Sequence, residues 1–254
     1  MPSPALSLKK KTAIVVVIGD EILSGYTLDT NSHYLSQVLR DCGVICLSRH
    51  TVRDDKEEIK RILKLSLDEK PDYLFLCGGL GPTHDDVTFE SVAEALQRRL
   101  VLSSAVVEHI QKKLDAINRL LPEEKWLREK MARIPEGTEV LCNKAGTAPA
   151  LRFCVGQTQL FLLPGVPHEL QWLIENEIKA NYLEEGCRKD YVVELTVKRG
   201  ESSFASLLKR IQKKHPHVKI GSYPQKGKVM LRISGEEEKE VKEVVETIEK
   251  EIIR

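Results

Sequence analysis

Three short segments of the sequence combine glycine with acidic residues, and these residue types can bind phosphate groups and metal ions. The segments are Gly19-Asp20-Glu21, Asp54-Asp55 and the glycine-rich run Gly78–Thr83. Each one directly follows an apolar run of strand length. Because ligands bind at the carboxyl ends of the strands in an open α/β sheet, we expect the three segments to meet in one crevice.

The glycine-rich run is the most informative of the three. Gly78, Gly79 and Gly81 stand between a buried strand and a helix, where backbone N–H groups can approach a phosphate and the helix dipole favours an anion. The alternative is a tight turn that needs glycine for its backbone angles alone. No Lys-Ser/Thr pair follows Gly81, which excludes a Walker phosphate loop, and the glycine spacing excludes the dinucleotide fingerprint.

Two adjacent acids, Asp85 and Asp86, follow this run. Thr83 and Asp86 have the spacing of a helix capping box, so one interpretation is that Asp86 only serves the helix start. The other is a metal site, because two carboxylates beside a phosphate repel it unless a divalent cation lies between them. Asp54 and Asp55 offer a further metal ligand or a general base, with helix capping again as the alternative.

A later loop, Asn143–Pro149, adds a cation and a glycine to the candidate residues, Lys144 and Gly146. Lys144 is a candidate phosphate contact, and an exposed loop lysine is the alternative. His215 and His217 have the spacing of a metal pair, but they lie between a predicted helix and strand of a separate module. The six cysteines contain no C-x-x-C pair, which argues against a zinc site.

Alternating strand and helix patterns position these segments. Three apolar runs of strand length recur in the first hundred residues, each followed by an amphipathic helical pattern, and the short links predict a mostly parallel sheet with helices on both faces. The runs are Thr12–Ile18, Val44–Val52 and Tyr73–Cys77, and helices are predicted over 32–41, from 55 onward and over 83–99. The expected fold class is therefore a three-layer α/β/α sandwich.

The composition changes after Gly186. From there a β-α-β-β-α pattern, ending in a highly charged helix, predicts a small α+β module with one solvated sheet face. We therefore expect a disordered start over residues 1–11, an α/β domain over 12–185 and an α+β domain over 186–254.

Charge and hydropathy exclude several classes of protein. The 254 residues carry 39 basic and 38 acidic side chains, a net charge of +1, so no global charge attracts nucleic acid or a membrane surface. No apolar run approaches the roughly 20 residues of a membrane-spanning helix. The lysine-rich start has no apolar signal core, which predicts a cytoplasmic protein, with a mitochondrial location as the alternative. A small-molecule partner is expected.

In the order and spacing of its motifs, the sequence resembles the molybdopterin-binding-like superfamily, specifically the CinA branch, which includes the amino-terminal domain of some eukaryotic FAD synthases. The resemblance covers roughly residues 12–175, and Gly221–Pro224 resembles the small domain that follows in this branch. The sequence departs from the branch at Ala150, where glycine is usual. The matching stretches are Gly19–Gly25, Asp29–Asn31, Gly78–Thr88, Gly146–Pro149 and Leu163–Glu169.

This resemblance implies two activities. The CinA branch is associated with metal-dependent hydrolysis of nucleotide diphosphates, either FAD or ADP-ribose, to AMP and a phosphorylated product. Relatives of the MogA and gephyrin type instead bind or adenylylate molybdopterin. A non-catalytic nucleotide-binding module is the third alternative, because one fold hosts several functions.

For the hydrolase, the resemblance implies catalytic roles for Asp54 and Asp86, with Asp85 and Asp86 holding Mg, Mn or Co and with K as a further candidate cation. Superfamily members associate as dimers or trimers, so a homo-oligomer is expected. The implied substrate-binding residues are Gly19, Glu21, Asn31, Gly78, Gly79, Gly81, Pro82, Thr83, Thr88, Lys144 and Gly146.

Overall fold

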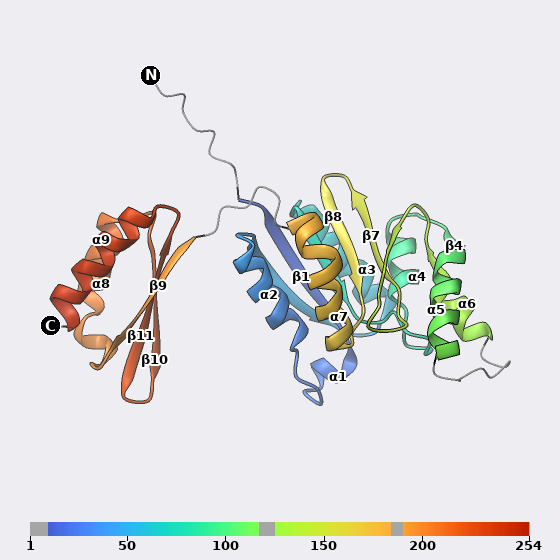
Figure 1. The fold of residues 1–254 in the computed structure, drawn as a ribbon, viewed down its shortest axis with the longest axis horizontal. Helices are drawn as coiled ribbons and strands as arrows, with labels where there is room; N and C mark the ends of the chain where they lie inside the picture. The colour runs from blue at the N-terminus through green and yellow to red at the C-terminus, as the bar shows by residue number, and fades with distance from the viewer. Residues whose placement is uncertain (1–9, 117–124, 184–189, 254) are drawn as a thin grey trace, which may run out of the picture. The chain divides into compact units, whose positions relative to one another are not determined.

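A computed structural model describes residues 10–116, 125–183 and 190–253 (Figure 1). The chain folds into two compact units, Met1–Cys187 and Arg188–Arg254. Residues 1–9 of the expected disordered start lie outside the described residues, and so does the expected domain boundary between 185 and 186. Both stay predictions. No helix in the described part of the chain is long and apolar enough to cross a membrane.

A six-stranded sheet forms the centre of the larger unit. Its strands are β1 (Thr12–Ile18), β2 (Ile45–Val52), β3 (Tyr73–Cys77), β6 (Glu139–Leu141), β7 (Ala150–Val155) and β8 (Thr158–Leu163). They are arranged in the order β2-β1-β3-β8-β7-β6. Strands β2, β1, β3 and β8 are parallel, and β7 runs antiparallel to both of its neighbours, β8 and β6. The mostly parallel sheet is therefore confirmed.

Helices cover both faces of this sheet (Figure 1). One face carries α2 (Asn31–Asp41), α7 (Pro167–Leu173) and the π-helix η2 (Ile174–Leu183), and the other carries α3 (Lys56–Asp68), α4 (Thr88–Ala95) and α5 (Ser104–Ala116). Strand β1 is apolar throughout because it is buried on both faces of the sheet. Alternate residues from Ala13 to Val17 pack toward α2, while those from Ile14 to Ile18 pack toward α3. The three-layer α/β/α architecture is confirmed.

The helix expected over 83–99 is wrong at both ends, because α4 covers only Thr88–Ala95. Before it, Asp86 Oδ2 accepts hydrogen bonds from Thr83 N and Oγ1, at 2.8 and 2.5 Å. A short acidic side chain that binds nearby backbone gives the chain an alternative to helix, so a turn forms there. After α4, Gln97 adopts a positive φ of 54° and ends the helical path.

A second, two-stranded sheet follows α4 and was not predicted. Strand β4 (Leu100–Leu102) pairs antiparallel with β5 (Arg133–Pro135), and α6 (Lys125–Ala132) leads directly into β5. This small sheet brings the end of α6 close to the start of the α4 segment, which matters for the site below.

The smaller unit has the predicted β-α-β-β-α order. Its antiparallel sheet has the order β10-β11-β9, and alternate residues of the central strand are buried against a separate apolar core contributed partly by its two helices. This alternation is typical of a sheet with one solvated face. The elements are β9 (Tyr191–Val197), η3 (Glu201–Ser203), α8 (Ala205–Lys214), β10 (Lys219–Gln225), β11 (Lys228–Gly235), α9 (Glu238–Ile248) and η4 (Glu249–Ile253).

Candidate functional site

The carboxyl ends of β1, β2 and β3 bring the three predicted segments together. Gly19 N donates a hydrogen bond to Val52 O at 3.0 Å, and Asp20 N donates to Asp54 Oδ2 at 3.0 Å. Asp54 also lies beside Gly79, because a Cβ added there would be 3.5 Å from Asp54 Oδ1. Residues far apart in the sequence therefore form one crevice at this edge of the sheet.

The turn after β3 needs glycine at two positions. Gly78 and Gly79 have φ angles of +112° and +66°, a region that side chains rarely adopt. A Cβ on Gly78 would lie 2.2 Å from Ile18 O, and one on Gly79 would lie 2.3 Å from Thr88 Oγ1. Thr88 is buried and donates to Gly78 O at 2.8 Å, which fixes the turn to the start of α4. Backbone geometry alone therefore requires both glycines, whatever the loop binds.

The segment that follows folds back on itself around Asp86. The capping interaction with Thr83 is present, but it closes a turn before α4 rather than starting the helix. Gly81 is also constrained, since a Cβ there would lie 2.6 Å from Asp86 Oδ2. Pro82, which follows Gly81 in this segment, is half-buried. Asp85 is exposed, and its pKa is lowered by a hydrogen bond from Thr83. Of the two adjacent acids, Asp85 is therefore the better placed to meet a ligand.

The crevice is acidic. Burial raises the pKa of Asp54, and repulsion by Glu21, Asp20 and Asp85 raises it further, while the hydrogen bond from Asp20 N opposes the shift. Three other carboxylates therefore act on Asp54 at the carboxyl edge of the sheet. A bare phosphate anion would be repelled here, and a cation would be attracted.

These oxygen donors fit a hard divalent cation. Among the described residues, no three His, Cys, Asp or Glu side chains are grouped closely enough to hold a metal by themselves. That does not conflict with Mg²⁺, which commonly uses one or two carboxylates together with waters and substrate phosphates. Asp54 and Asp85 are the pair that the charge coupling favours, because Asp85 is among the carboxylates that raise the pKa of Asp54 and Asp86 is not.

A lysine that the sequence analysis missed lies beside the glycine-rich run. Lys130, near the end of α6, donates from Nζ to Thr83 O, and its positive charge helps to lower the pKa of Asp85. It also lines a small cavity of about 40 Å³ together with Gly81 and Asp86. In the sequence it is one lysine of a charged helix, and only the β4–β5 sheet brings it here.

The predicted lysine, Lys144, is placed differently. Its backbone oxygen accepts a hydrogen bond from Lys113 of α5, and no contact between its side chain and the glycine-rich run is found among the described residues. Its loop is held by Asn143, whose Oδ1 accepts from Gly146 N at 3.1 Å and whose Nδ2 donates to Glu169 Oε2 at 2.6 Å. Asn143 and Glu169 are both buried.

Glu169 makes glycine obligatory in this loop. A Cβ added at Gly146 would lie 1.9 Å from Glu169 Cδ. The α7 segment that carries Glu169 also approaches the crevice, since a Cβ at Gly165 would lie 3.3 Å from the Gly78 Cα. The motif containing Glu169 was noted in the sequence, but its role in clamping the loop was not.

Asn31 lies on the other side of the crevice, at the start of α2. Its Nδ2 donates to Gly165 O at 2.7 Å, and its buried Oδ1 has no hydrogen-bond partner among the described residues. Asn31 and Glu21 line a cavity of about 60 Å³, next to the ends of β1 and β3. Gly19 is close to the same carboxylate, because a Cβ there would be 2.7 Å from Glu21 Oε1.

Comparison with known proteins identifies the family. Residues 14–183 match a family model described as "probable molybdopterin binding domain". The chain belongs to this molybdopterin-binding domain family. Residues 189–253 of this family member match a second model, described as the middle domain of FAD synthase. The resemblance noted in the sequence is confirmed, and it extends over both units.

Relatives place this member of the family in the CinA branch. The crystal structure of CinA from Thermoplasma acidophilum, titled as a protein of unknown function, is 36% identical with a TM-score of 0.59, covering 65% of this chain and 95% of that one. A protein of Pyrococcus abyssi is 38% identical over 92% of this chain and 94% of its own length. A CinA-like protein of Flavobacterium psychrophilum is 33% identical over 87% of this chain but only 53% of its own length.

Proposed function

We propose that this protein is a metal-dependent hydrolase of nucleotide diphosphates, which cleaves FAD or ADP-ribose to AMP and a phosphorylated product. The observation that carries the proposal is the pairing of an acidic crevice, centred on Asp54 and Asp85, with the glycine-rich turn at Gly78 and Gly79. The match of residues 189–253 to the middle domain of FAD synthase makes FAD the first substrate to test.

The crevice would hold a divalent cation, Mg, Mn or Co, with K as a candidate second cation. We expected Asp85 and Asp86 as its ligands, and the charge coupling of Asp85 to Asp54, which Asp86 does not share, favours Asp54 and Asp85 instead. When bound, such a cation neutralises the diphosphate and polarises its phosphorus–oxygen bonds. Asp86 then acts by holding the loop in shape.

The chain's own residues supply the rest. Lys130 Nζ and the backbone N–H groups of Gly79 and Gly81 would bind the diphosphate oxygens on the loop side. Asp54 would accept the proton of the attacking water. Its carboxylate lies next to the turn that would hold the diphosphate, because a Cβ added at Gly79 would be 3.5 Å from Asp54 Oδ1.

Molybdopterin binding is the second candidate, favoured by the match of residues 14–183 to the molybdopterin binding domain. The same crevice would take the pterin ligand. The third candidate is a module that binds a nucleotide in this crevice without hydrolysing it. A dimer or trimer is expected in all three cases.

The deciding experiment follows AMP release by chromatography. Purified protein is incubated with FAD or ADP-ribose in the presence of Mg, Mn or Co, with and without K. We expect AMP from at least one substrate, and none after a chelator is added. Failure to release AMP with any metal, together with tight binding of either nucleotide, would overturn the hydrolase and leave the binding module. Binding of molybdopterin alone would support the second candidate.

A further inference from the structure

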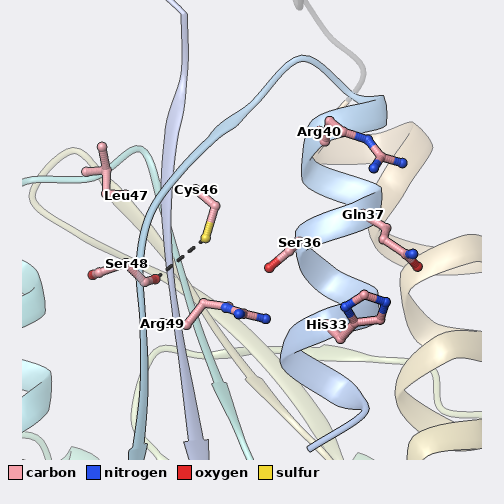
Figure 2. A pocket seen from close by; sticks show the side chains of 8 residues that line it. All are labelled: His33, Ser36, Gln37, Arg40, Cys46, Leu47, Ser48 and Arg49. Atoms are coloured by element: carbon pink, nitrogen blue, oxygen red, sulfur yellow. Dashed lines mark hydrogen bonds between the residues drawn. The ribbon is translucent and has the colours of Figure 1, made fainter. Parts of the chain in front are cut away.

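A second hollow lies on the larger unit, away from the carboxyl edge of the sheet. It is a groove of about 440 Å³ between α2 and β2, the free edge strand of the six-stranded sheet (Figure 2). We call it the α2–β2 groove. Its lining residues are His33, Ser36, Gln37 and Arg40 from α2, and Cys46, Leu47, Ser48 and Arg49 from β2.

A bulge in β2 places the side chains of Cys46 and Arg49 on the same side of the strand, the side that faces α2. Ala13 of β1 pairs with Cys46, but the next residue pairs with Ser48, so Leu47 is an extra residue in the strand. Arg49 pairs with Val15, and Ala13 and Val15 both belong to the cluster that packs against α2. In a regular strand, residues three apart face opposite sides. Here Cys46 and Arg49 both point toward α2, and Leu47 points away (Figure 2).

The groove is lined by cations and by no carboxylate. Arg40 has an exposed ion pair with its neighbour Asp41, at 2.9 Å, which contributes little. Arg49 has no ion pair in the described part of the chain, and its one hydrogen bond is a long contact of 3.4 Å from Nη1 to Ser32 Oγ. His33 adds an exposed ring at the same groove. Figure 2 shows the Arg49 guanidinium pointing from β2 toward α2, whereas Arg40 extends from α2 away from β2. The Arg49 guanidinium can bind the oxygens of an anion in a bidentate manner.

We propose that the α2–β2 groove binds a phosphate-bearing small molecule of nucleotide size. The volume lies within the range typical of small-molecule sites and exceeds what inorganic phosphate needs. Arg49 holds the phosphate, and the Ser36 hydroxyl, which points from α2 toward β2 (Figure 2), is placed to bind the same molecule. Because the charges are positive without any added ion, binding here needs no metal. The site is separate from the crevice, and the inference goes beyond the hydrolase proposed above.

Cys46 provides a local reporter of occupancy. Its half-buried thiol lies in the groove and donates to Ser48 O at 3.6 Å, whereas Cys142 and Cys154 are exposed elsewhere. The full chain is labelled with a small thiol reagent, with chelator present, and each cysteine peptide is quantified by mass spectrometry. With AMP at about ten times its Kd, Cys46 labelling should slow about tenfold, while Cys142 and Cys154 keep their rates. Inorganic phosphate at equal concentration should protect less, because it fills less of the groove.

Variants separate this site from the crevice. Arg49→Gln should remove the protection, and Arg61→Gln, an exposed arginine of α3, should keep it. Asp54→Asn, in the crevice, should also keep it. The proposal is overturned if neither AMP nor phosphate slows Cys46 labelling, or if Arg49→Gln is protected like the wild type. Cys46 that stays unreactive in the folded protein without ligand also overturns it, because a groove closed to a small reagent is closed to a nucleotide.

Discussion

The crevice at the ends of β1, β2 and β3 and the α2–β2 groove belong to the same sheet, but their charges are opposite. Around Asp54 the neighbouring groups are carboxylates, while around Arg49 they are cations and neutral polar groups. The crevice is built from turns that need glycine, and the groove from a helix and a bulged strand. An acidic site can bind a diphosphate only with a cation, whereas a basic site binds phosphate directly. Metal dependence should therefore distinguish the two regions.

The largest effect is expected from Asp54→Asn. It removes the proposed base and one carboxylate of the cation site while keeping a side-chain acceptor for Asp20 N. AMP release from FAD or ADP-ribose should fall about 100-fold or more, which is the usual contribution of a general base. Steady-state kinetics measure the loss, and circular dichroism checks the fold. Asp68→Asn, an exposed acid at the end of α3, is the matched control and should leave turnover unchanged.

Retention of full turnover by Asp54→Asn would move the chemistry to another residue of the crevice. Asp86→Asn is then the next test, since it keeps an acceptor oxygen for Thr83 where Asp86→Ala would open the loop.

Gly146→Ala should have the next largest effect, on stability rather than on chemistry. The new methyl would meet the buried Glu169 carboxyl, so Asn143 and its loop must shift. Overpacking of this kind destabilises by about 1–3 kcal/mol, and the thermal midpoint should fall by several degrees. Gly200→Ala, where nothing lies within 4 Å of the added Cβ and φ is −65°, should stay within about 0.5 kcal/mol of the wild type. Equal stability of the two variants would show that Glu169 and the Asn143 loop can shift to admit the methyl group at no cost in stability.

Lys130→Met tests the cation at the glycine-rich run. It removes the charge beside Thr83 and Asp85, so KM for the diphosphate substrate should rise about tenfold, as expected for one charged hydrogen bond. Lys130→Arg, which keeps the positive charge, should have a KM close to that of the wild type. Lys144→Met, whose side chain has no described contact with that run, should change KM less than about twofold. A larger effect of Lys144 than of Lys130 would reverse this assignment.

The contrast between these two lysines shows what the sequence could predict. Alternating apolar runs place the strands, and parallel strands bring their carboxyl ends together, so the meeting of Gly19, Asp54 and Gly79 followed from the pattern. Local chemistry near the same edge was also predictable in part, since Thr83 and Asp86 do interact. Their interaction replaces the first turns of the expected helix, because side-chain and helical hydrogen bonds compete for the same backbone groups.

The same arguments could not predict the contacts that depend on packing between distant parts of the chain. Lys130 reaches Thr83 only because β4 and β5 pair, and strands of three residues give almost no periodic signal. Glu169 stands at a helix start, where an acid is ordinary, and its burial against Asn143 depends on how α7 packs. The α2–β2 groove depends on one inserted residue, Leu47, and a single-residue bulge cannot be recognised from alternation alone.

The smallest effect is a pH dependence that belongs to the crevice and not to the groove. The raised pKa of Asp54 means that the native state binds this proton more tightly than the unfolded state, whose value is near 3.8. The contribution of Asp54 to stability is therefore fully present below pH 3.8 and is lost as pH rises through its native pKa. Asn does not titrate, so Asp54→Asn should gain stability relative to the wild type as pH rises through that range. Thermal unfolding from pH 3.5 to 8, with chelator present, measures the difference.

Arg49→Gln serves as the contrasting variant, because no carboxylate lines its groove. Its stability relative to the wild type should stay constant over the same acidic range. Added Mg²⁺ should stabilise the wild type at neutral pH and do so less in Asp54→Asn, since the cation relieves the repulsion that raises the pKa. If the Asp54→Asn and wild-type curves run parallel at every pH, the pKa of Asp54 is not raised, and neither burial nor its acidic neighbours act on it. The acidic crevice would then give no reason for a metal, and the difference between the two regions would be one of shape alone.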